Sequence, residues 1–456
     1  MKYKDYIKTK ELIFNPVGFE IENDINPMLF PFQKDITKWA LKKGRACLFE
    51  DCGLGKTPQQ LEWAKHVSQK ENKPVLIVAP LAVAEQTQME GIKFGIPVNI
   101  CANQSDVIIE KINITNYEKL HKFDGSSFGG VVLDESSILK NMSGAIRNQI
   151  IDMFQTVPYR LACTATPSPN DYMELGNHSE FLGIMTYSEM LSMFFVNDSG
   201  DVGKWRLKKH ANERKFWQWL CSWAVMLSKP SDLGYEQEGF DLPPLNYIEH
   251  KLPALSKGTG FFVQEAKTME ERRKIRRETI QIRCEKAAEI INNTDDQWAV
   301  WCGLNNESSL LTKLIDNAKE VAGATDFEIR KKRMLGFANE TVHRIVTKPS
   351  IAGFGMNWQN CNKMVFVGLN DSWEQFYQAT RRLWRFGQTK PVECHVIIEE
   401  REGSVLKNIK RKDEQAKYMI KNIIQETKDL TKLEIQNKTK VNTKSKIKME
   451  LPQWIN

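Results

Sequence analysis

The strongest chemical signal in this sequence is a glycine-rich loop that follows a short apolar run and precedes an amphipathic segment. It reads Phe49-Glu-Asp-Cys-Gly-Leu-Gly-Lys-Thr57. Between a strand and a helix, such a loop brings backbone amides at the helix start close to a phosphate group. The residues that would line a phosphate site are Gly53, Leu54, Gly55, Lys56 and Thr57. Lys56 would neutralise phosphate charge, and Thr57 would offer its hydroxyl to Mg²⁺. Glu50 stands where the general pattern has a glycine, and a chance glycine turn is the alternative interpretation.

An acidic pair, Asp134-Glu135, closes the apolar run Gly129-Gly-Val-Val-Leu133. Two carboxylates at the end of a buried strand cost free energy unless they serve a purpose. We expect Asp134 to hold Mg²⁺ together with Thr57, and Glu135 to polarise an attacking water molecule. The alternative is a helix N-cap made by Asp134 or Ser136.

Two arginines form the third candidate group. Arg382 and Arg385 are three residues apart in a segment predicted to be helical, so they would share one face of the helix. Both could then reach a single triphosphate and stabilise the charge of the phosphoryl group in transfer, with Gln378 just before them. A solvated basic helix face that includes Arg381 is the alternative.

The elements that must position these residues form two series of short apolar runs. The runs of the first series are Ala46–Phe49, Val75–Ala79, Ile112–Thr115, Val131–Leu133 and Tyr159–Cys163. The runs of the second are Ala299–Cys302, His343–Val346, Met364–Val367 and Cys394–Ile398. Helix-like segments such as 58–69 and 84–94 separate several of them. Alternating strands and helices predict an α/β fold with two parallel sheets, each covered by helices on both faces.

The segment between the two series has a different amino-acid composition. Residues 180–227 are rich in tryptophan, with a spacing that fits helices, and we expect Trp205, Trp217, Trp219 and Trp223 to be core rather than to stack on bases. The Pro- and Gly-rich residues 229–244 predict a linker. Residues 265–292 predict a charged helix.

The positive charge is concentrated in the C-terminal part of the chain. The whole chain has 64 Lys and Arg against 57 Asp and Glu, whereas residues 406–448 alone have 13 against 5. A second basic run covers residues 271–277 and continues with Arg283 and Lys286. Either region could bind a polyanion, although a solvated helix face or a solubilising tail is an equally good explanation.

Composition also disfavours membrane, disulfide and zinc proteins. The longest apolar stretch, residues 75–84, is broken by Pro80 and is shorter than the roughly 20 residues that span a bilayer. The N-terminus has no apolar signal region. The nine cysteines form no C-x-x-C pair. We therefore expect a cytoplasmic protein without membrane contact, in a reducing compartment, with mostly buried thiols.

Four motifs in order resemble those of superfamily 2 helicases: Gly-Leu-Gly-Lys-Thr57, Asp-Glu-Ser-Ser137, Thr164-Ala-Thr-Pro167 and Gln378-Ala-Thr-Arg-Arg-Leu-Trp-Arg-Phe-Gly-Gln388. The last motif resembles the Swi/Snf-type branch, the DNA translocases of chromatin remodelling and their bacterial and phage relatives. The compact lobes look most like small phage- or prophage-encoded members. The resemblance implies two RecA-like lobes with ATP and Mg²⁺ in the cleft between them, and DNA as the partner.

Weaker matches extend the resemblance to further residues. It implies that Gln33 reads adenine and that Thr164 and Thr166 couple the nucleotide site to nucleic acid. Gly355 and Asn357 belong to a second-lobe motif that is one residue shorter here than the remodeller pattern. The acidic motif ends in two serines instead of the common D-E-A-H or D-E-x-D endings, so its link to the Thr-Ala-Thr segment is expected to differ.

These patterns lead to one predicted organisation. It consists of an N-terminal extension (1–27), an ATP-binding lobe (28–178), a helical insert with linker (179–244), a second lobe (245–426) and a basic tail (427–456). The predicted function is a DNA-stimulated ATPase that acts as a translocase or helicase on DNA, with phage or host replication or recombination proteins as possible partners. An RNA helicase and a non-catalytic, ATP-switched DNA loader are the alternatives.

Overall fold

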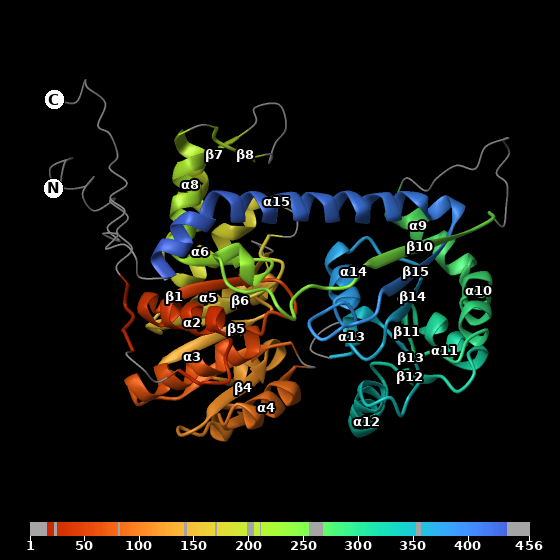
Figure 1. Ribbon diagram of the computed structural model, residues 1–456, viewed down its shortest axis with the longest axis horizontal. Coiled ribbons are helices and arrows are strands. Elements are labelled where there is room, and N and C mark those ends of the chain that lie inside the picture. Colours follow the sequence, from red (N-terminus) through yellow and green to blue (C-terminus); the bar gives the residue numbers. More distant parts are fainter. Residues whose placement is uncertain are drawn as a thin grey trace. The chain divides into compact units, whose positions relative to one another are not determined.

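The computed structural model of the chain describes residues 16–21, 25–80, 83–140, 144–168, 171–197, 205–209, 211–254, 268–352 and 357–435. The chain divides into two compact units (Figure 1). The first comprises residues 1–236 together with 419–456, and the second comprises residues 237–418. Each unit is built around one parallel sheet, as the alternating pattern predicted.

The sheet of the first unit has seven parallel strands in the order β3-β4-β2-β5-β6-β1-β9. Their bounds are Arg45–Glu50 (β1), Val75–Ala79 (β2), Val98–Ile100 (β3), Ile112–Asn116 (β4), Gly130–Asp134 (β5), Tyr159–Cys163 (β6) and Ala224–Leu227 (β9). Strands β2, β5 and β6 are buried at every position, as in a sheet covered on both faces. All five predicted strands are confirmed, whereas β3 and β9 were not predicted.

The helices of the first unit surround this sheet, and a short hairpin extends from them. The helices are Pro31–Lys43 (α2), Lys56–Glu71 (α3), Ala84–Lys93 (α4), Ala145–Phe154 (α5), Leu175–Leu182 (α6), Tyr187–Phe194 (α7) and Ala211–Cys221 (α8). The antiparallel hairpin strands are Phe195–Asn197 (β7) and Trp205–Leu207 (β8).

The tryptophan-rich segment contributes to the core of the first unit. Trp217, Trp219 and Trp223 are buried, and Trp205 packs against the same apolar cluster. The rings of Trp219 and Trp223 meet edge to face with centroids 5.1 Å apart. The prediction that these tryptophans are core residues is therefore confirmed for Trp217, Trp219 and Trp223, whereas Trp205 is partly buried at the edge of the core.

The sheet of the second unit has six parallel strands in the order β10-β15-β14-β11-β13-β12. Their bounds are Leu245–Leu252 (β10), Trp298–Cys302 (β11), Lys319–Val321 (β12), Arg344–Thr347 (β13), Lys363–Val367 (β14) and Val392–Glu399 (β15). The helices are Met269–Glu278 (α9), Ile280–Asn292 (α10), Asn305–Leu314 (α11), Phe327–Ala338 (α12), Pro349–Ala352 (α13) and Trp373–Thr380 (α14). The four predicted strands are confirmed. The charged segment predicted as one helix forms α9 and α10 over its described part, with a break at Thr279.

A single long helix, Gly403–Ile435 (α15), crosses the predicted boundary between second lobe and tail. Its residues Val405, Leu406 and Ile409 belong to the core of the second unit, and Met419 and Ile423 to that of the first. The basic tail therefore begins as packed helix, and residues 436–456 lie outside the described part. The predicted insert also differs, because β9 joins the first sheet and the first unit extends to Glu236.

The cysteines are mostly inside the protein. Eight of the nine cysteines are buried and Cys52 is half-buried, as predicted for the thiols.

Within the described residues, we find no helix with the length and apolar character needed to cross a bilayer.

Candidate functional site

Three of the predicted motifs meet at one edge of the first sheet. The glycine-rich loop follows β1, Asp134 ends β5, and Thr164 follows β6. Since β6 pairs in parallel with both β1 and β5, the carboxyl ends of all three strands lie side by side. In open parallel sheets this edge is where ligands bind.

The glycine-rich loop adopts a backbone that requires its glycines. Gly53 and Gly55 have φ of 91° and 78°, in the left-handed region where other residues are strained. A Cβ atom at Gly55 would lie 2.2 Å from the side-chain Nε2 of Gln33. Helix α3 begins directly after the loop at Lys56, so Lys56 and Thr57 lie in its first turn. The predicted strand–loop–helix context is present.

Lys56 is the cation of this loop. Its Nζ donates to the carbonyl oxygens of Glu50 at 2.8 Å and Asp51 at 3.2 Å. Burial alone would lower the pKa of this ammonium group, but nearby negative charge raises it above its ordinary value. The groups that raise it are Cys52, Glu135, Glu50 and Asp134. Lys56 is therefore a protonated group in a setting dominated by carboxylates.

Glu50 is a buried carboxyl group under the loop that sequence reasoning assigned no role. Its Oε2 accepts a hydrogen bond of 2.8 Å from Nε2 of Gln59 on α3. Burial raises the pKa of Glu50 to about 7, because the opposing effects of Lys56 and Gln59 are smaller. The side chain takes the place of a glycine in the general pattern, and its charge depends on pH near neutrality.

The acidic pair is held by Gln60 and Tyr117, which come from two different elements. Oδ1 of Asp134 accepts a 2.7 Å hydrogen bond from Nε2 of Gln60, and the hydroxyl of Tyr117 donates to the backbone oxygen of Asp134 at 2.7 Å. Glu135 has φ of 53°, an unusual conformation for a non-glycine residue and one that a site must hold in place. Gln60 was missed, although it lies four residues after Lys56 and thus on the same face of α3.

The Thr-Ala-Thr segment lies beside the acidic pair. Oγ1 of Thr164 is 3.5 Å from Oε2 of Glu135, at the outer limit of a hydrogen bond. The same Oγ1 accepts a 3.1 Å hydrogen bond from the backbone amide of Thr166. The structure therefore brings Thr164 and Glu135 together, while the coupling role predicted for Thr164 and Thr166 stays a prediction.

These residues fit a magnesium–triphosphate pair. The start of α3 directly after the loop presents backbone amides of the kind that bind phosphate, and a Cβ atom at Gly55 would collide with Gln33 beside the loop. The carboxylates around Lys56 outnumber it, which favours a cation at the same place. Thr57 and Asp134 offer hard oxygen ligands of the kind Mg²⁺ prefers, and such sites need only one or two carboxylates besides the phosphates.

Gln33 is hydrogen-bonded to the glycine-rich loop. Its Oε1 accepts from the backbone amide of Phe30 at 2.9 Å, and its Nε2 donates to the backbone oxygen of Leu54 at 2.7 Å. The side chain is 96% buried. Gln33 therefore supports the phosphate loop directly, and adenine reading by Gln33 stays a prediction.

The arginine motif in the second unit differs from its predicted geometry. Helix α14 ends at Thr380, so Arg382 and Arg385 lie in turns and do not share a helix face. The helix ends because the amides of Arg382 and Leu383 bond to carbonyls only three residues back, at Ala379 and Thr380. The prediction of a shared helix face is wrong.

Arg382 and Gln378 form a buried pair within this unit. Arg382 donates from its guanidinium to Oε1 of Gln378 at 3.1 Å and to the backbone oxygen of Gln378 at 3.2 Å. Arg385 is half-buried. The backbone amide of Trp358 donates to the carbonyl of Arg382 at 3.0 Å, which places the segment of Asn357 against the motif. Gly355 lies outside the described residues.

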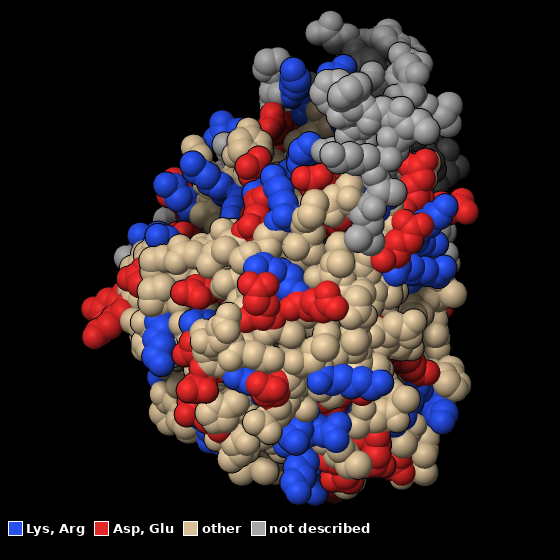
Figure 2. Space-filling view, turned by 90° about the vertical axis from the view of Figure 1, so that its right-hand side faces the viewer, with Lys and Arg blue, Asp and Glu red and all other residues tan. Residues whose placement is uncertain are grey.

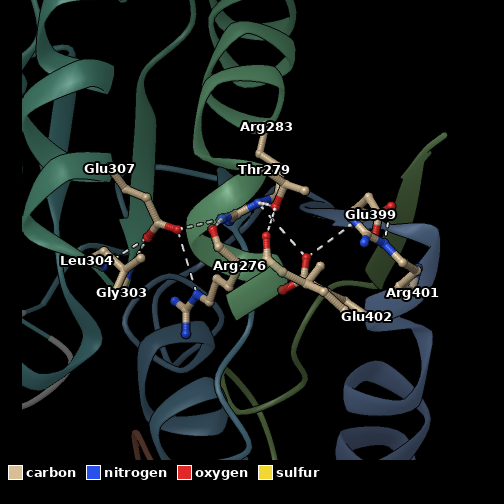
Figure 3. Close-up of polar contacts among 10 residues, drawn as sticks. Arg276, Thr279, Arg283, Gly303, Leu304, Glu307, Glu399, Arg401 and Glu402 are labelled. Carbon is tan, nitrogen blue, oxygen red and sulfur yellow. Dashed lines mark hydrogen bonds and ion pairs between the residues drawn. The ribbon is translucent and has the colours of Figure 1, made fainter. Parts of the chain in front are cut away.

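The second basic run is largely committed to ion pairs inside the second unit (Figure 3). A guanidinium nitrogen of the fully buried Arg283 lies 2.8 Å from Oε1 of Glu307, and Nε of Arg276 lies 3.6 Å from the same oxygen. Arg272 pairs with Asp371 at 2.6 Å. On the side of the second unit that carries α10 and α11, basic and acidic side chains are interspersed (Figure 2). The arginines of this run therefore form ion pairs within the second unit in addition to contributing positive charge.

Comparison with known proteins gives a family match for part of the first unit. Residues 32–199 match the family described as SNF2-related domain. This part of the first unit is therefore similar to SNF2-related domains. This confirms the resemblance to the Swi/Snf-type branch of superfamily 2, while the narrower resemblance to phage-encoded members stays a prediction.

Individual relatives cover different parts of the chain. A SWI/SNF-related matrix-associated actin-dependent regulator of chromatin subfamily A-like protein 1 from Xenopus tropicalis is 28% identical over 167 residues, which are 34% of this chain and 17% of that protein. The DNA annealing helicase and endonuclease ZRANB3 from Bos taurus is 23% identical over 441 residues, 85% of this chain and 39% of that protein. The chain thus spans less than half the length of both relatives.

One solved structure is similar over most of the chain. It is the Sulfolobus solfataricus SWI2/SNF2 ATPase core in complex with dsDNA, with 20% identity and a TM-score of 0.43. The match covers 84% of this chain and 90% of that chain.

Proposed function

We propose that this protein is an ATP-driven motor on nucleic acid: a DNA-stimulated ATPase that translocates along DNA or unwinds it. The observation that carries the proposal is the convergence of Lys56, Asp134 and Glu135 at the carboxyl edge of one parallel sheet, inside the part of the chain that is similar to SNF2-related domains. A phosphate loop alone would support only nucleotide binding. A strained glutamate beside it supplies the group that hydrolysis requires.

Each residue at this edge has a distinct proposed role. The amides of Gly53, Leu54 and Gly55 bind phosphate oxygens, and Lys56 neutralises their charge. Thr57 and Asp134 hold Mg²⁺, which when bound withdraws charge from the phosphates. Glu135 orients the attacking water and accepts its proton.

The remaining predicted residues act around this centre. Gln33 holds the loop by its bond to Leu54 and reads adenine from there. Arg385 of the second unit stabilises the phosphoryl group during its transfer. Arg382 holds the side chain of Gln378 in place by a hydrogen bond. Thr164 and Thr166 transmit the state of the nucleotide to the nucleic-acid site, together with Gly355 and Asn357.

The proposed setting is the cytoplasm of a bacterial or phage-infected cell, with replication or recombination proteins as partners. Contacts with the DNA backbone would be independent of sequence and weakened by salt. An RNA helicase remains the second candidate, because superfamily 2 motors act on either polymer. A loader that binds ATP without hydrolysis is the third, and the position of Glu135 next to Asp134 disfavours it.

One experiment separates these candidates. ATP turnover of the full chain is measured with no polymer, single-stranded DNA, duplex DNA and RNA, beside Lys56→Ala as the inactive control. We expect DNA to stimulate turnover more than RNA, and Lys56→Ala to show none. Stronger stimulation by RNA would favour the RNA helicase, and ATP binding without turnover on any polymer would favour the loader.

A further inference from the structure

Helix α6 carries three consecutive polar side chains that are at least 99% buried: Asn177, His178 and Ser179. Buried polar groups in native proteins nearly always have hydrogen-bond partners, so each should reveal what it serves. Asn177 accepts from Nε of Arg147 at 3.3 Å, and Ser179 donates to the backbone oxygen of Met185 at 3.0 Å. Arg147 lies on α5 and Met185 lies in the turn between α6 and α7, so these two contacts stay away from the acidic motif. The contact of His178 leads elsewhere.

His178 reaches the acidic motif. Its Nε2 lies 3.1 Å from Oγ of Ser136, which is itself fully buried. The ring of Phe49, at the end of β1, meets the imidazole edge to face with centroids 5.1 Å apart, so the ring orientation is fixed by packing as well. Ser136 is the residue after Glu135, and Phe49 is the residue before Glu50. His178 therefore lies between the two strand ends that form the site.

The imidazole is neutral at physiological pH. Burial lowers the pKa of His178 to about 4, although backbone groups of Glu174 and Ser136 oppose the shift. A neutral imidazole has one donor and one acceptor nitrogen. Nε2 is the nitrogen that faces Ser136, whereas Nδ1 has no hydrogen-bond partner among the described residues. The hydroxyl of Ser136 can both donate and accept, so it can pair with Nε2 in either tautomer.

The contact matters because of the backbone it secures. Glu135 has φ of 53°, which costs about 1–2 kcal/mol relative to the ordinary helical region and persists only where the surroundings enforce it. On one side, the hydroxyl of Tyr117 holds the backbone oxygen of Asp134 at 2.7 Å. On the other side, His178 holds the hydroxyl of Ser136. The strained residue lies between two buried hydrogen bonds.

We propose that His178 is a positioning residue of this site: through Ser136 it fixes the turn that aims the carboxylate of Glu135. The proposal rests on the proposed hydrolytic function of Glu135. The acidic motif of this chain ends in two serines, where related motifs end in histidine or aspartate. The polar group that supports the motif comes instead from α6, 42 residues away in sequence. Ser136 and His178 are inaccessible to substrate, so they do not form a nucleophilic pair.

The primary test compares two substitutions of His178. His178→Leu places an apolar side chain of similar size in the pocket and removes the polar partner of Ser136. His178→Gln can place its terminal amide, which both donates and accepts, near the position of Nε2. We expect His178→Leu to lower kcat for ATP roughly ten- to a hundredfold, in the range that small misplacements of catalytic groups cost. Nucleotide affinity, measured by equilibrium binding without turnover, should stay within twofold, and His178→Gln should restore most of kcat.

Ser179 provides the matched control on the same helix. Its hydroxyl is equally buried and hydrogen-bonded, but it bonds away from the acidic motif. Ser179→Ala should lower the thermal unfolding midpoint while leaving kcat within about twofold of wild type, because one lost hydrogen bond affects stability alone. Unfolding midpoints of all variants are recorded beside the kinetics. This comparison separates a positioning role from a loss of packing.

A double-mutant cycle with Ser136→Ala tests the path of the effect. If His178 acts through Ser136, Ser136→Ala should reduce kcat as much as His178→Leu, and the double variant should be no worse than either. Independent, multiplying effects would refute the path. Should His178→Leu fail to fold, Ser136→Ala and His178→Gln still carry the test, since Ser136→Ala with wild-type kcat would also refute it. A folded His178→Leu with normal kcat refutes the proposal but leaves the ATPase intact, whereas absence of turnover in wild type refutes the proposed function itself.

Discussion

The close approach of Gln33 to the phosphate loop can be tested by adding a single methyl group. Gly55→Ala forces an alanine into φ of 78° and places its Cβ 2.2 Å from Nε2 of Gln33. The left-handed conformation costs a non-glycine residue about 1–2 kcal/mol. The amide of Gln33 must also move, which breaks its buried bond to Leu54 and costs about 1–3 kcal/mol more. We therefore expect a loss of about 2–5 kcal/mol in the free energy of unfolding of the first unit.

Gly95 supplies the control for the backbone contribution. It has φ of 68°, and a Cβ there would meet nothing within 4 Å. Gly95→Ala should therefore cost only the conformational part, about 1–2 kcal/mol. Urea unfolding followed by tryptophan fluorescence measures both losses, since several tryptophans lie in the core of the first unit.

A second background isolates the contact with Gln33. In a Gln33→Ala chain, Gly55→Ala should cost no more than Gly95→Ala, because the atom it would strike is gone. Equal losses for Gly55→Ala and Gly95→Ala in the wild-type background would refute the close approach and the support that Gln33 is inferred to give the loop.

Three further predictions concern charge. Since the pKa of Glu50 is raised from 4.5 to about 7, the folded state holds the extra proton between these values, so wild-type stability should fall as pH rises through this window. Glu50→Gln should flatten that fall in pH-dependent unfolding, and an unchanged slope would contradict the assignment. Arg385→Ala should reduce kcat with little change in ATP affinity measured without DNA, because its proposed contact arises in the transition state; normal kcat would remove it from the site. Truncation after Ile435 removes five lysines and one glutamate, and should flatten the salt dependence of DNA binding without changing ATP turnover in the absence of DNA; an unchanged slope would place the contacts elsewhere.

The truncation point shows why the tail boundary was difficult to place from sequence. Thr427, Thr431 and Ile435 are buried, so α15 continues to pack nine residues beyond the predicted end of the second lobe. Residues 427–435 include two lysines, two threonines, an aspartate and a glutamate, and these polar residues conceal the helical spacing of the few buried ones. Cutting at residue 427 would remove packed side chains and confuse stability with DNA binding.

The sheets could be predicted because their strands are continuous apolar runs. Val75–Ala79 and Tyr159–Cys163 are buried at every residue. A short run of mostly apolar residues in the sequence indicates such a fully buried strand directly. The three-residue β3 and β12 carry too little pattern to be recognised. β9 was concealed by the tryptophans around it, and only its parallel pairing with β1 makes it a strand.

The site was predicted where its residues are local and missed where they are distant. Lys56 and Glu135 stand in motifs with recognisable spacing. Gln60, Tyr117 and His178 contact the acidic motif from three other elements, and their sequence positions carry no mark of this. The prediction that Arg382 and Arg385 share a helix face was wrong for a related reason. Helix α14 ends through turn hydrogen bonds that residue spacing alone does not reveal.

The proposed motor function depends on Glu135 and on DNA, and both are tested by ATP turnover of wild type and Glu135→Gln, with and without duplex DNA, beside the ATP affinity of both. Glu135→Gln keeps the size of the side chain and leaves Asp134 in place, but removes the carboxylate that should activate water. We expect DNA-stimulated turnover in wild type, and in Glu135→Gln normal ATP binding with turnover reduced at least a hundredfold, roughly the lower bound for a lost general base. Wild-type turnover in Glu135→Gln, or no response of the wild type to DNA, would contradict the proposed function.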